Sequence, residues 1–122
     1  MAISNYRDLA VWTKAMNVAR AVYQLADLMP KREEYRLTSQ LIRAAISIPA
    51  NIAEGHTRAT RRDYAHFISI ARGSAAELET LLLLAENASL APIDDIRPIL
   101  VATEEVGRML DALHSKLKSP NT

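Results

Sequence analysis

The residues whose type and spacing most clearly suggest a binding function are arginines near the middle of the chain. Arg61 and Arg62 follow Thr60 at the expected start of a helix, and Arg58 lies just before them. The helix dipole disfavours cations at that position, so these arginines indicate a function. Guanidinium groups beside free backbone N–H groups suit a phosphate. We therefore predict that Arg58, Arg61 and Arg62 contact nucleic acid, with a merely solvated turn as the alternative.

A second polar group follows one face of the preceding predicted helix, at Gln40, Arg43, Ser47, Asn51 and Glu54. This stripe borders an apolar face, and we expect it to contact Ser74 and Glu77 of the next helix. The expected contacts are an Arg43–Glu77 ion pair or an Asn51–Ser74 hydrogen bond, which would set the helix register. We assign a structural role to the polar residues Arg43, Asn51, Glu54 and Glu77.

No residues are predicted to be catalytic, and we expect the protein not to be an enzyme. Glu54 and Glu77 have no evident nucleophile or histidine partner. His56, His66 and His114 lack the spacing of a bundle metal site, and the chain has no cysteine. We expect no metal, no cofactor and no small-molecule substrate. No apolar run approaches the ~20 residues that span a bilayer, so we expect a cytoplasmic protein without a membrane partner.

These residues must be positioned by helices, because Ala and Leu are abundant and 49% of the 122 residues are hydrophobic. Apolar periodicity predicts four helices, at about 6–29, 32–54, 61–87 and 94–118. Short links predict one all-α domain over 1–122, an antiparallel up-down-up-down four-helix bundle. Pro49 lies inside the second helix and should bend it.

Several residues are expected to begin or end these helices. Ser4 or Asn5 would cap the first helix, and Pro30 would end it. Gly55 is expected to end the second helix in a left-handed conformation. Thr60 and Asp63 resemble a capping box, and Asp94 or Asp95 would cap the fourth helix.

Each helix has an apolar stripe for the core. The first stripe comprises Leu9, Trp12, Met16, Ala19, Tyr23 and Ala26. The second comprises Leu37, Leu41, Ala44, Ile48 and Ile52. The third comprises Tyr64, Phe67, Ile68, Ala71, Ala75, Leu78 and Leu82. The fourth comprises Ile96, Ile99, Leu100, Thr103, Val106, Leu110, Leu113 and Leu117.

Two helices carry more apolar residues than one core stripe needs. The second helix has an extra face at Ile42, Ile46 and Ala53, and four consecutive leucines at 81–84 surround the third. Large exposed apolar patches are uncommon on monomers. We therefore predict a subunit interface at Ile42, Ile46, Ala53, Leu83 and Leu84, with a wide bundle core as the alternative.

Charge is unevenly distributed along the chain. Residues 1–72 hold 11 Lys and Arg against 6 Asp and Glu, while residues 73–122 hold 4 against 8. In the predicted topology one end gathers Arg7, Lys14, Arg58, Arg61, Arg62, Lys116 and Lys118 against Asp8, Glu54, Asp63 and Asp111. The other end carries Asp27, Glu33, Glu34, Glu86, Asp94 and Asp95. Arg7 and Lys14 are therefore added to the predicted nucleic-acid contacts.

The middle of the chain resembles a known family. Residues 40–55, QLIRAAISIPANIAEG, are similar to the signature of four-helix bundle proteins encoded in 23S ribosomal RNA intervening sequences. Three further pieces agree: Asp8-Leu-x-x-Trp12-x-x-Ala15, Glu34-x-x-Leu37, and Ile70-Ala-x-Gly73-Ser-x-x-Glu77-Leu-Glu79. The resemblance covers roughly residues 6–85.

The resemblance implies a four-helix bundle that forms a ring-like homo-oligomer, commonly a pentamer, with no known enzymatic activity. Accessory proteins of diversity-generating retroelements are similar, and there a basic pentamer binds nucleic acid and a reverse transcriptase. Two functions follow as hypotheses. The first is an oligomeric accessory protein that binds RNA or DNA, and the second is a protein-interaction scaffold without a nucleic-acid role.

Overall fold

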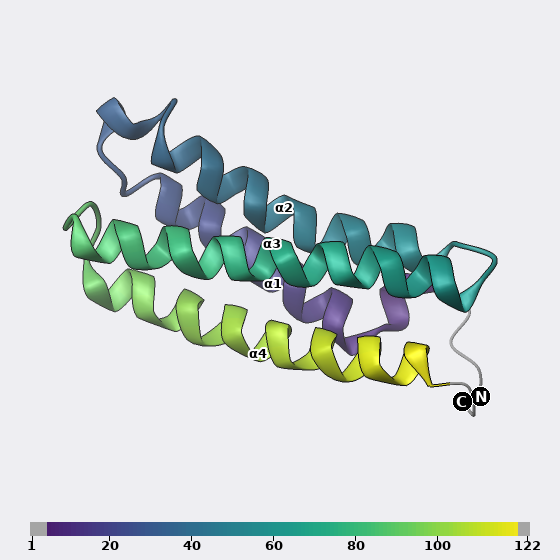
Figure 1. The fold of residues 1–122 in the computed structure, drawn as a ribbon. Helices are drawn as coiled ribbons and strands as arrows, with labels where there is room; N and C mark the ends of the chain where they lie inside the picture. The colour runs from purple at the N-terminus through teal and green to yellow at the C-terminus, as the bar shows by residue number, and fades with distance from the viewer. Residues whose placement is uncertain (1–4, 120–122) are drawn as a thin grey trace.

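The computed structural model describes residues 5–119, and this part contains helices and no strand (Figure 1). The α-helices are α1 (Ala10–Ala26), α2 (Leu37–His56), α3 (Arg61–Asn87) and α4 (Ile93–Lys118). Short 3-10 turns precede the first two, η1 (Tyr6–Asp8) and η2 (Lys31–Glu33). The prediction of an all-α protein with four helices is confirmed.

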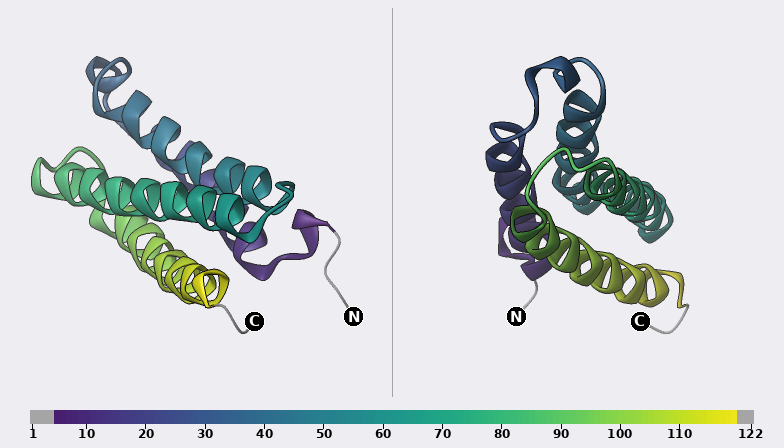
Figure 2. Two further views of the ribbon diagram at one scale, coloured as in Figure 1. Left: turned by 45° about the vertical axis from the view of Figure 1, so that its right-hand side comes forward. Right: turned by 90° about the vertical axis from the view of Figure 1, so that its left-hand side faces the viewer.

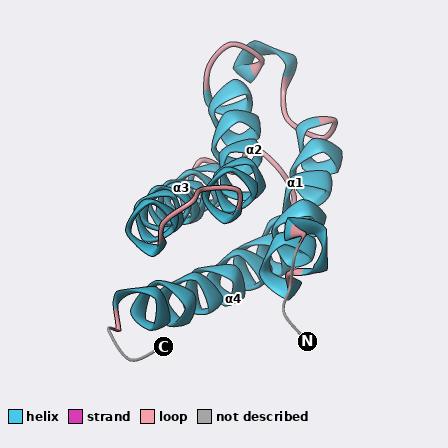
Figure 3. Cartoon of the chain, turned by 90° about the vertical axis from the view of Figure 1, so that its right-hand side faces the viewer, coloured by secondary structure: helices cyan, strands magenta, loops and turns pink. Residues whose placement is uncertain are grey.

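The four helices pack as a bundle. Helix α1 packs against α2 and α4, and α3 packs against the same two helices. Viewed from one end, the helices surround a common centre in chain order (Figure 3). The start of α1, the α2–α3 turn and the end of α4 lie at one end of the molecule, which we call the turn end (Figures 1 and 2). The other two connections lie at the opposite end.

Two helices begin later than predicted. The extended backbone of Leu9 separates η1 from α1, and Asn5 accepts a hydrogen bond from the Arg7 N–H at 2.9 Å. Asn5 thus caps η1 and not a long first helix, while Ser4 lies outside the described residues. Helix α2 begins after η2, at Leu37. Helix α3 has the predicted bounds, and α4 begins at Ile93, one residue early.

The core is built from the predicted stripes of α2, α3 and α4. Thr103 is fully buried, and its hydroxyl donates to the Ile99 carbonyl at 2.7 Å, so no polar atom is left unpaired there. The largest fully buried apolar side chains on these helices are Leu41, Ile48, Ile52, Ile68, Leu78, Leu82, Ile96, Val106 and Leu110.

The predicted core stripe of α1 is wrong for Met16 and Tyr23, whereas Leu9 and Trp12 are half-buried and pack against the core. Met16 is 37% exposed and Tyr23 is 52% exposed, whereas Ala19 alone of the predicted set is buried within α1. The α1 residues in the core are Val11, Ala15, Val18, Ala19, Val22 and Leu25. The sequence pattern of α1 itself indicates the buried side, because the exposed polar residues Thr13, Asn17, Arg20 and Gln24 recur at three and four on the opposite face. The predicted stripe was placed one row to the side of the buried face.

Gly55 does not have the predicted left-handed backbone, because no described glycine has a positive φ. It lies inside α2, where a Cβ would be 2.8 Å from the Phe67 Cβ and 3.2 Å from the Tyr64 carbonyl oxygen. Glycine is therefore needed for the close approach of α2 and α3. The predicted cap of α4 is also wrong, since Pro92 precedes the helix and Asp94 and Asp95 lie in its first turn.

Candidate nucleic-acid interface

The turn between α2 and α3 presents the predicted arginines. Thr60 caps α3, and its Oγ1 accepts a hydrogen bond from the Asp63 N–H at 3.1 Å, as expected of a capping box. On the α2 side, the Thr57 hydroxyl donates to the Glu54 carbonyl at 2.8 Å. The two threonines satisfy backbone groups at the turn, and this fixes where the neighbouring arginine side chains begin.

Arg61 joins the start of α3 to the end of α4. Its Nη2 donates to the carbonyl oxygen of Lys116 at 2.7 Å. The last carbonyls of a helix lack partners within the helix, and a cation is favoured beside them. A cation in the first turn of α3 therefore lies beside the favourable end of another helix, which sequence reasoning missed because the partner is 55 residues away.

Three other predicted cations also have partners inside the chain. The Arg58 guanidinium pairs with Glu54 at 2.8 Å and lies 4.6 Å from the centre of the Phe67 ring. Arg7 lies 5.0 Å from the centre of the Tyr6 ring. Lys14 on α1 pairs with Glu105 on α4 at 2.9 Å. The Lys14 ammonium lowers the pKa of Glu105, chiefly through its hydrogen bond and then through its charge.

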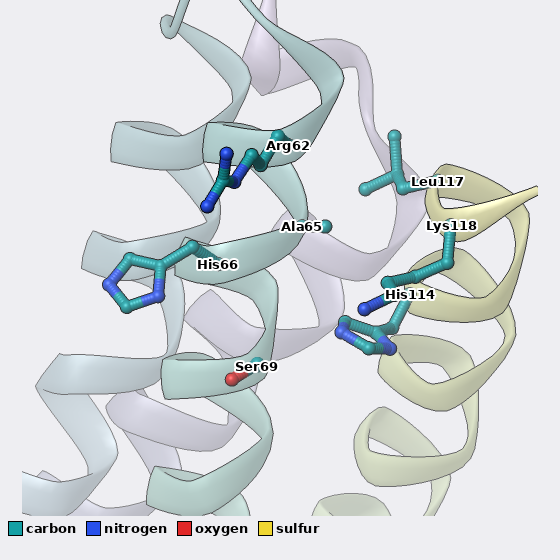
Figure 4. Close-up of a pocket in the computed structure, with 7 residues that line it drawn as sticks. All are labelled: Arg62, Ala65, His66, Ser69, His114, Leu117 and Lys118. Carbon is teal, nitrogen blue, oxygen red and sulfur yellow. The ribbon is translucent and has the colours of Figure 1, made fainter.

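Arg62 differs from these four, because its side chain makes no ion pair, hydrogen bond or ring contact within residues 5–119. It lines a pocket of about 450 Å³ between the start of α3 and the end of α4 (Figure 4). The α3 side is formed by Arg62, Ala65, His66 and Ser69, and the α4 side by His114, Leu117 and Lys118. In Figure 4, His114 and Lys118 extend from α4 toward α3. We call this cavity the α3–α4 pocket.

The turn end carries the predicted excess of cations, but the contrast with the opposite end is smaller than expected. The acidic residues predicted there share that end with Lys31, Arg32, Arg36 and Arg97. Arg97 on α4 bonds to Glu86 on α3 at 2.7 Å, and Arg36 lies 3.9 Å from Glu33. The opposite end is therefore largely neutralised rather than strongly acidic.

The polar stripe of α2 forms one interhelical hydrogen bond, though not the one predicted. The hydroxyls of Ser47 and Ser74 lie 2.8 Å apart across α2 and α3. Asn51 donates to the carbonyl of Ser47 at 2.8 Å and to its hydroxyl at 3.0 Å, so it orients Ser47 instead of contacting Ser74. Arg43 and Glu77 are both exposed and form no ion pair in the described part of the chain.

A second interhelical cluster was not predicted. The Arg72 Nε bonds to Asp111 on α4 at 2.9 Å, and its Nη1 lies 3.6 Å from Glu79. A Cβ at Gly107 would lie 2.9 Å from the Arg72 Nη1, so the glycine gives the guanidinium room against α4. No local signal in the sequence identifies this pairing, because Arg72 and Asp111 lie on different helices.

The predicted interface residues fall on two faces. On α2, Ile42 and Ile46 line a groove of about 480 Å³ together with Ala26 of α1. Ile46 is 43% exposed, and Ala53 is half-buried further along α2. Met16 and Tyr23 add exposed apolar surface on α1, which sequence reasoning assigned to the core. We call Met16, Tyr23, Ile42, Ile46 and Ala53 the α1–α2 face.

Leu83 and Leu84 lie elsewhere, on α3, and are 41% and 50% exposed. Leu83 is four residues after Glu79 and three before Glu86, so it shares a helical face with these two residues. Both glutamates contact cations on the α3–α4 side of the bundle: Glu79 contacts Arg72 and Glu86 contacts Arg97 of α4. Leu83 therefore lies at the α3–α4 side, and α3 is diagonally opposite α1 in the bundle (Figure 3).

Residues 5–119 contain no group of three or more His, Cys, Asp or Glu side chains that is arranged to hold a metal ion. None of the helices in this part of the chain is long and apolar enough to cross a membrane.

Comparison with known proteins agrees with this architecture. A crystal structure of a protein of unknown function from Bacteroides thetaiotaomicron, of the S23 ribosomal protein family, is similar with a TM-score of 0.79 and 25% identity. The match covers 90% of this chain and 100% of that one. No curated protein sequence matches the chain. The family model for the 23S rRNA-intervening sequence protein matches residues 7–112. The chain therefore belongs to the 23S rRNA-intervening sequence protein family.

Proposed function

We propose that this protein is a non-enzymatic, homo-oligomeric accessory protein that binds nucleic acid through its turn end in the cytoplasm. The observation that carries the proposal is the excess of cations around the α2–α3 turn and the end of α4. The name of the family, 23S rRNA-intervening sequence protein, supports RNA transcribed from 23S intervening sequences as the partner. Binding would be electrostatic and largely independent of sequence, because no base-reading motif accompanies the cations.

The partners of these cations do not prevent phosphate binding. The Arg58–Glu54 and Lys14–Glu105 pairs lie at the surface, with side chains exposed by 44–49%. Exposed ion pairs typically contribute only about 0–1 kcal/mol, so a phosphate can replace the carboxylate at small cost. Arg61 is different, because moving it would release the end of α4. We therefore assign phosphate contact chiefly to Arg58 and Arg62, helped by Arg7 and Lys14.

The oligomer in this proposal is a ring. The α1–α2 face and Leu83 with Leu84 lie on different sides of the bundle, so they do not form one self-complementary patch. Contact between two different faces is head-to-tail, and such contacts close into rings when the rotation allows it. The pentameric count comes from the family resemblance. Each subunit would be an antiparallel up-down-up-down bundle, with α2 bent where Pro49 lacks an N–H donor.

Binding to a structured ribosomal RNA fragment and to duplex DNA across a salt series tests the proposal. The variant Arg58→Gln/Arg62→Gln should bind more weakly and reduce the slope of log K against log salt by about 0.9 for each phosphate that it no longer neutralises. The matched control Arg20→Gln/Arg108→Gln removes the same charge from exposed positions in the middle of α1 and α4. The control should keep most of the affinity, at the same oligomer mass.

Absence of binding at low salt by an intact oligomer would contradict the proposal. It would favour the second candidate, a protein-interaction scaffold without a nucleic-acid role. The specific observation behind that candidate is the apolar groove lined by Ile42 and Ile46, together with the exposed Tyr23. Equal weakening by the two variants would show that net charge alone, and not the turn end, attracts nucleic acid.

A further inference from the structure

Within residues 5–119, the α3–α4 pocket is lined by basic and neutral side chains and by no acidic one. Four of its side chains can carry positive charge, Arg62 and His66 from α3 and His114 and Lys118 from α4. Ser69 adds a hydroxyl that can donate a hydrogen bond, while Ala65 and Leu117 are apolar. No carboxylate among the described residues lines the pocket. A cavity with cations on both walls and no acidic residue suits an anion.

Neighbouring acidic residues do not cancel this charge. Asp63 and Asp111 are the carboxylates three residues before His66 and His114, and neither lines the pocket. The Asp111 carboxylate is bonded to Arg72 at 2.9 Å. The hydrogen bond from Arg61 to the Lys116 carbonyl joins α3 to α4, the two helices that form the walls of the pocket. Arg61 is next to Arg62 in the sequence, and Lys116 is two residues before Lys118. Figure 4 shows His114 and Lys118 extending from α4 toward α3, whereas Arg62 and His66 extend from α3 on the side away from α4. The four side chains line the pocket from two helices that are joined at this point.

We infer that the α3–α4 pocket binds a single phosphate group, and that in the nucleic acid of the proposed function this group is a terminal phosphate monoester. A monoester carries a charge of about −1.5 to −2 at neutral pH, more than a backbone diester, so a lining that holds the Arg62 and Lys118 cations and, among the described residues, no carboxylate favours it. The volume of about 450 Å³ exceeds a phosphate ion and leaves room for the attached nucleoside. The assignment of the group to a nucleic-acid end rests on the proposed function, whereas the phosphate site itself does not.

Inorganic phosphate tests the site alone. Titration of the purified protein with inorganic phosphate, followed by NMR of the histidine ring protons, should shift the signals of His66 and His114 in a saturable way. The variant Arg62→Gln/Lys118→Gln should weaken this binding by about tenfold or more, since two charge-assisted hydrogen bonds are removed. The control Arg20→Gln/Arg108→Gln should bind as the original protein does. Unshifted histidine signals, or equal loss in both variants, would overturn the site.

Two oligonucleotides separate this inference from the proposed function. The same RNA strand is tested with a terminal phosphate and with a terminal hydroxyl. Tighter binding of the phosphorylated strand, abolished in Arg62→Gln/Lys118→Gln, would support the pocket as an end-binding site. Equal binding of both strands would overturn the end-binding assignment while leaving the proposed function in place. Phosphate binding without any RNA binding would overturn the proposed function and the end assignment, but not the phosphate site.

Discussion

At the scale of single residues, the turn end is organised by side chains that satisfy backbone groups. Arg61 bonds to a carbonyl of α4, Thr60 caps α3, and Gly55 lets α3 approach α2. The residues around the proposed phosphate contacts therefore also stabilise the bundle. Most substitutions at the turn end should change both nucleic-acid binding and stability. Arg62 is the best position for changing binding alone, because its side chain makes no contact that supports the fold.

Gly55 and Gly73 are both helical glycines, but only Gly55 is in close contact with a neighbouring helix. A Cβ at Gly55 would collide with the Phe67 Cβ and the Tyr64 backbone, whereas one at Gly73 meets nothing within 4 Å. Overpacking costs about 1–3 kcal/mol and alanine favours helix by about 1 kcal/mol. Gly55→Ala should therefore lower the free energy of unfolding by on the order of 1 kcal/mol. Gly73→Ala should raise it by about 0.5–1 kcal/mol.

Urea denaturation at one fixed protein concentration measures both glycine variants, because the stability of an oligomer depends on concentration. Equal changes in the two variants would show that α2 and α3 are further apart at Gly55 than the structure places them.

Lys14 and Glu105 predict a pH dependence of stability. The pKa of Glu105 is below its ordinary value of 4.5, so the stability that this ion pair contributes is present above pH 4.5 and is lost as the pH falls below it. Lys14→Gln should raise the pKa of Glu105, as measured by NMR titration of its carboxyl carbon. The control Arg20→Gln removes a charge from the same helix without contacting Glu105. An unchanged pKa of Glu105 in Lys14→Gln would show that the pair does not form in solution.

At the scale of elements, the helices are held in register by polar contacts around the apolar core. Ser47 and Ser74 connect α2 to α3, while Arg72 and Arg97 connect α3 to α4. Hydrogen bonds between defined positions allow fewer alternative alignments than an apolar stripe, which can slide by one turn. The polar side chains therefore specify the alignment of helices that the core alone would hold less exactly.

The Ser47–Ser74 contact can be measured as a coupling. A double-mutant cycle with Ser47→Ala and Ser74→Ala should give a coupling energy of about 0.5–1.5 kcal/mol, the usual net contribution of a hydrogen bond. The control cycle pairs Ser74→Ala with Ser39→Ala, whose hydroxyl bonds instead to the Arg36 carbonyl. That control should show no coupling. Zero coupling in the first cycle would mean that the two hydroxyls do not interact in solution.

At the scale of the whole molecule, charge and apolar surface occupy different regions. Cations gather at the turn end, while the apolar α1–α2 face and Leu83 with Leu84 lie along the sides of the bundle. In a ring formed through the sides, every turn end would face the same way. Copies of a modest local charge would then form one broad positive rim, which increases the attraction for nucleic acid.

Mixing two interface variants tests the head-to-tail arrangement. Ile46→Glu and Leu83→Glu each place a charge in one of the two faces, so each variant alone should be monomeric. A mixture should form a heterodimer and no ring, because one intact α1–α2 face can still meet one intact Leu83 face. Native mass spectrometry measures the mass of each assembly and so distinguishes monomer, heterodimer and ring. An oligomer that survives either substitution, or a mixture that stays monomeric, would contradict the proposed contact.

The sequence by itself determined the four helices, the core faces of α2, α3 and α4, and the family. In those three helices the main apolar stripe is distinct enough for period alone to predict burial. In α1 the polar residues Thr13, Asn17, Arg20 and Gln24 mark the exposed side, so the burial of Val18 and Val22 opposite them also follows from the sequence, and the error lay in assigning Tyr23 to the core. The partner of Arg61 and the α3–α4 pocket depended on tertiary structure. Long side chains meet groups that are distant in the sequence, and local patterns carry no information about which helix ends lie together.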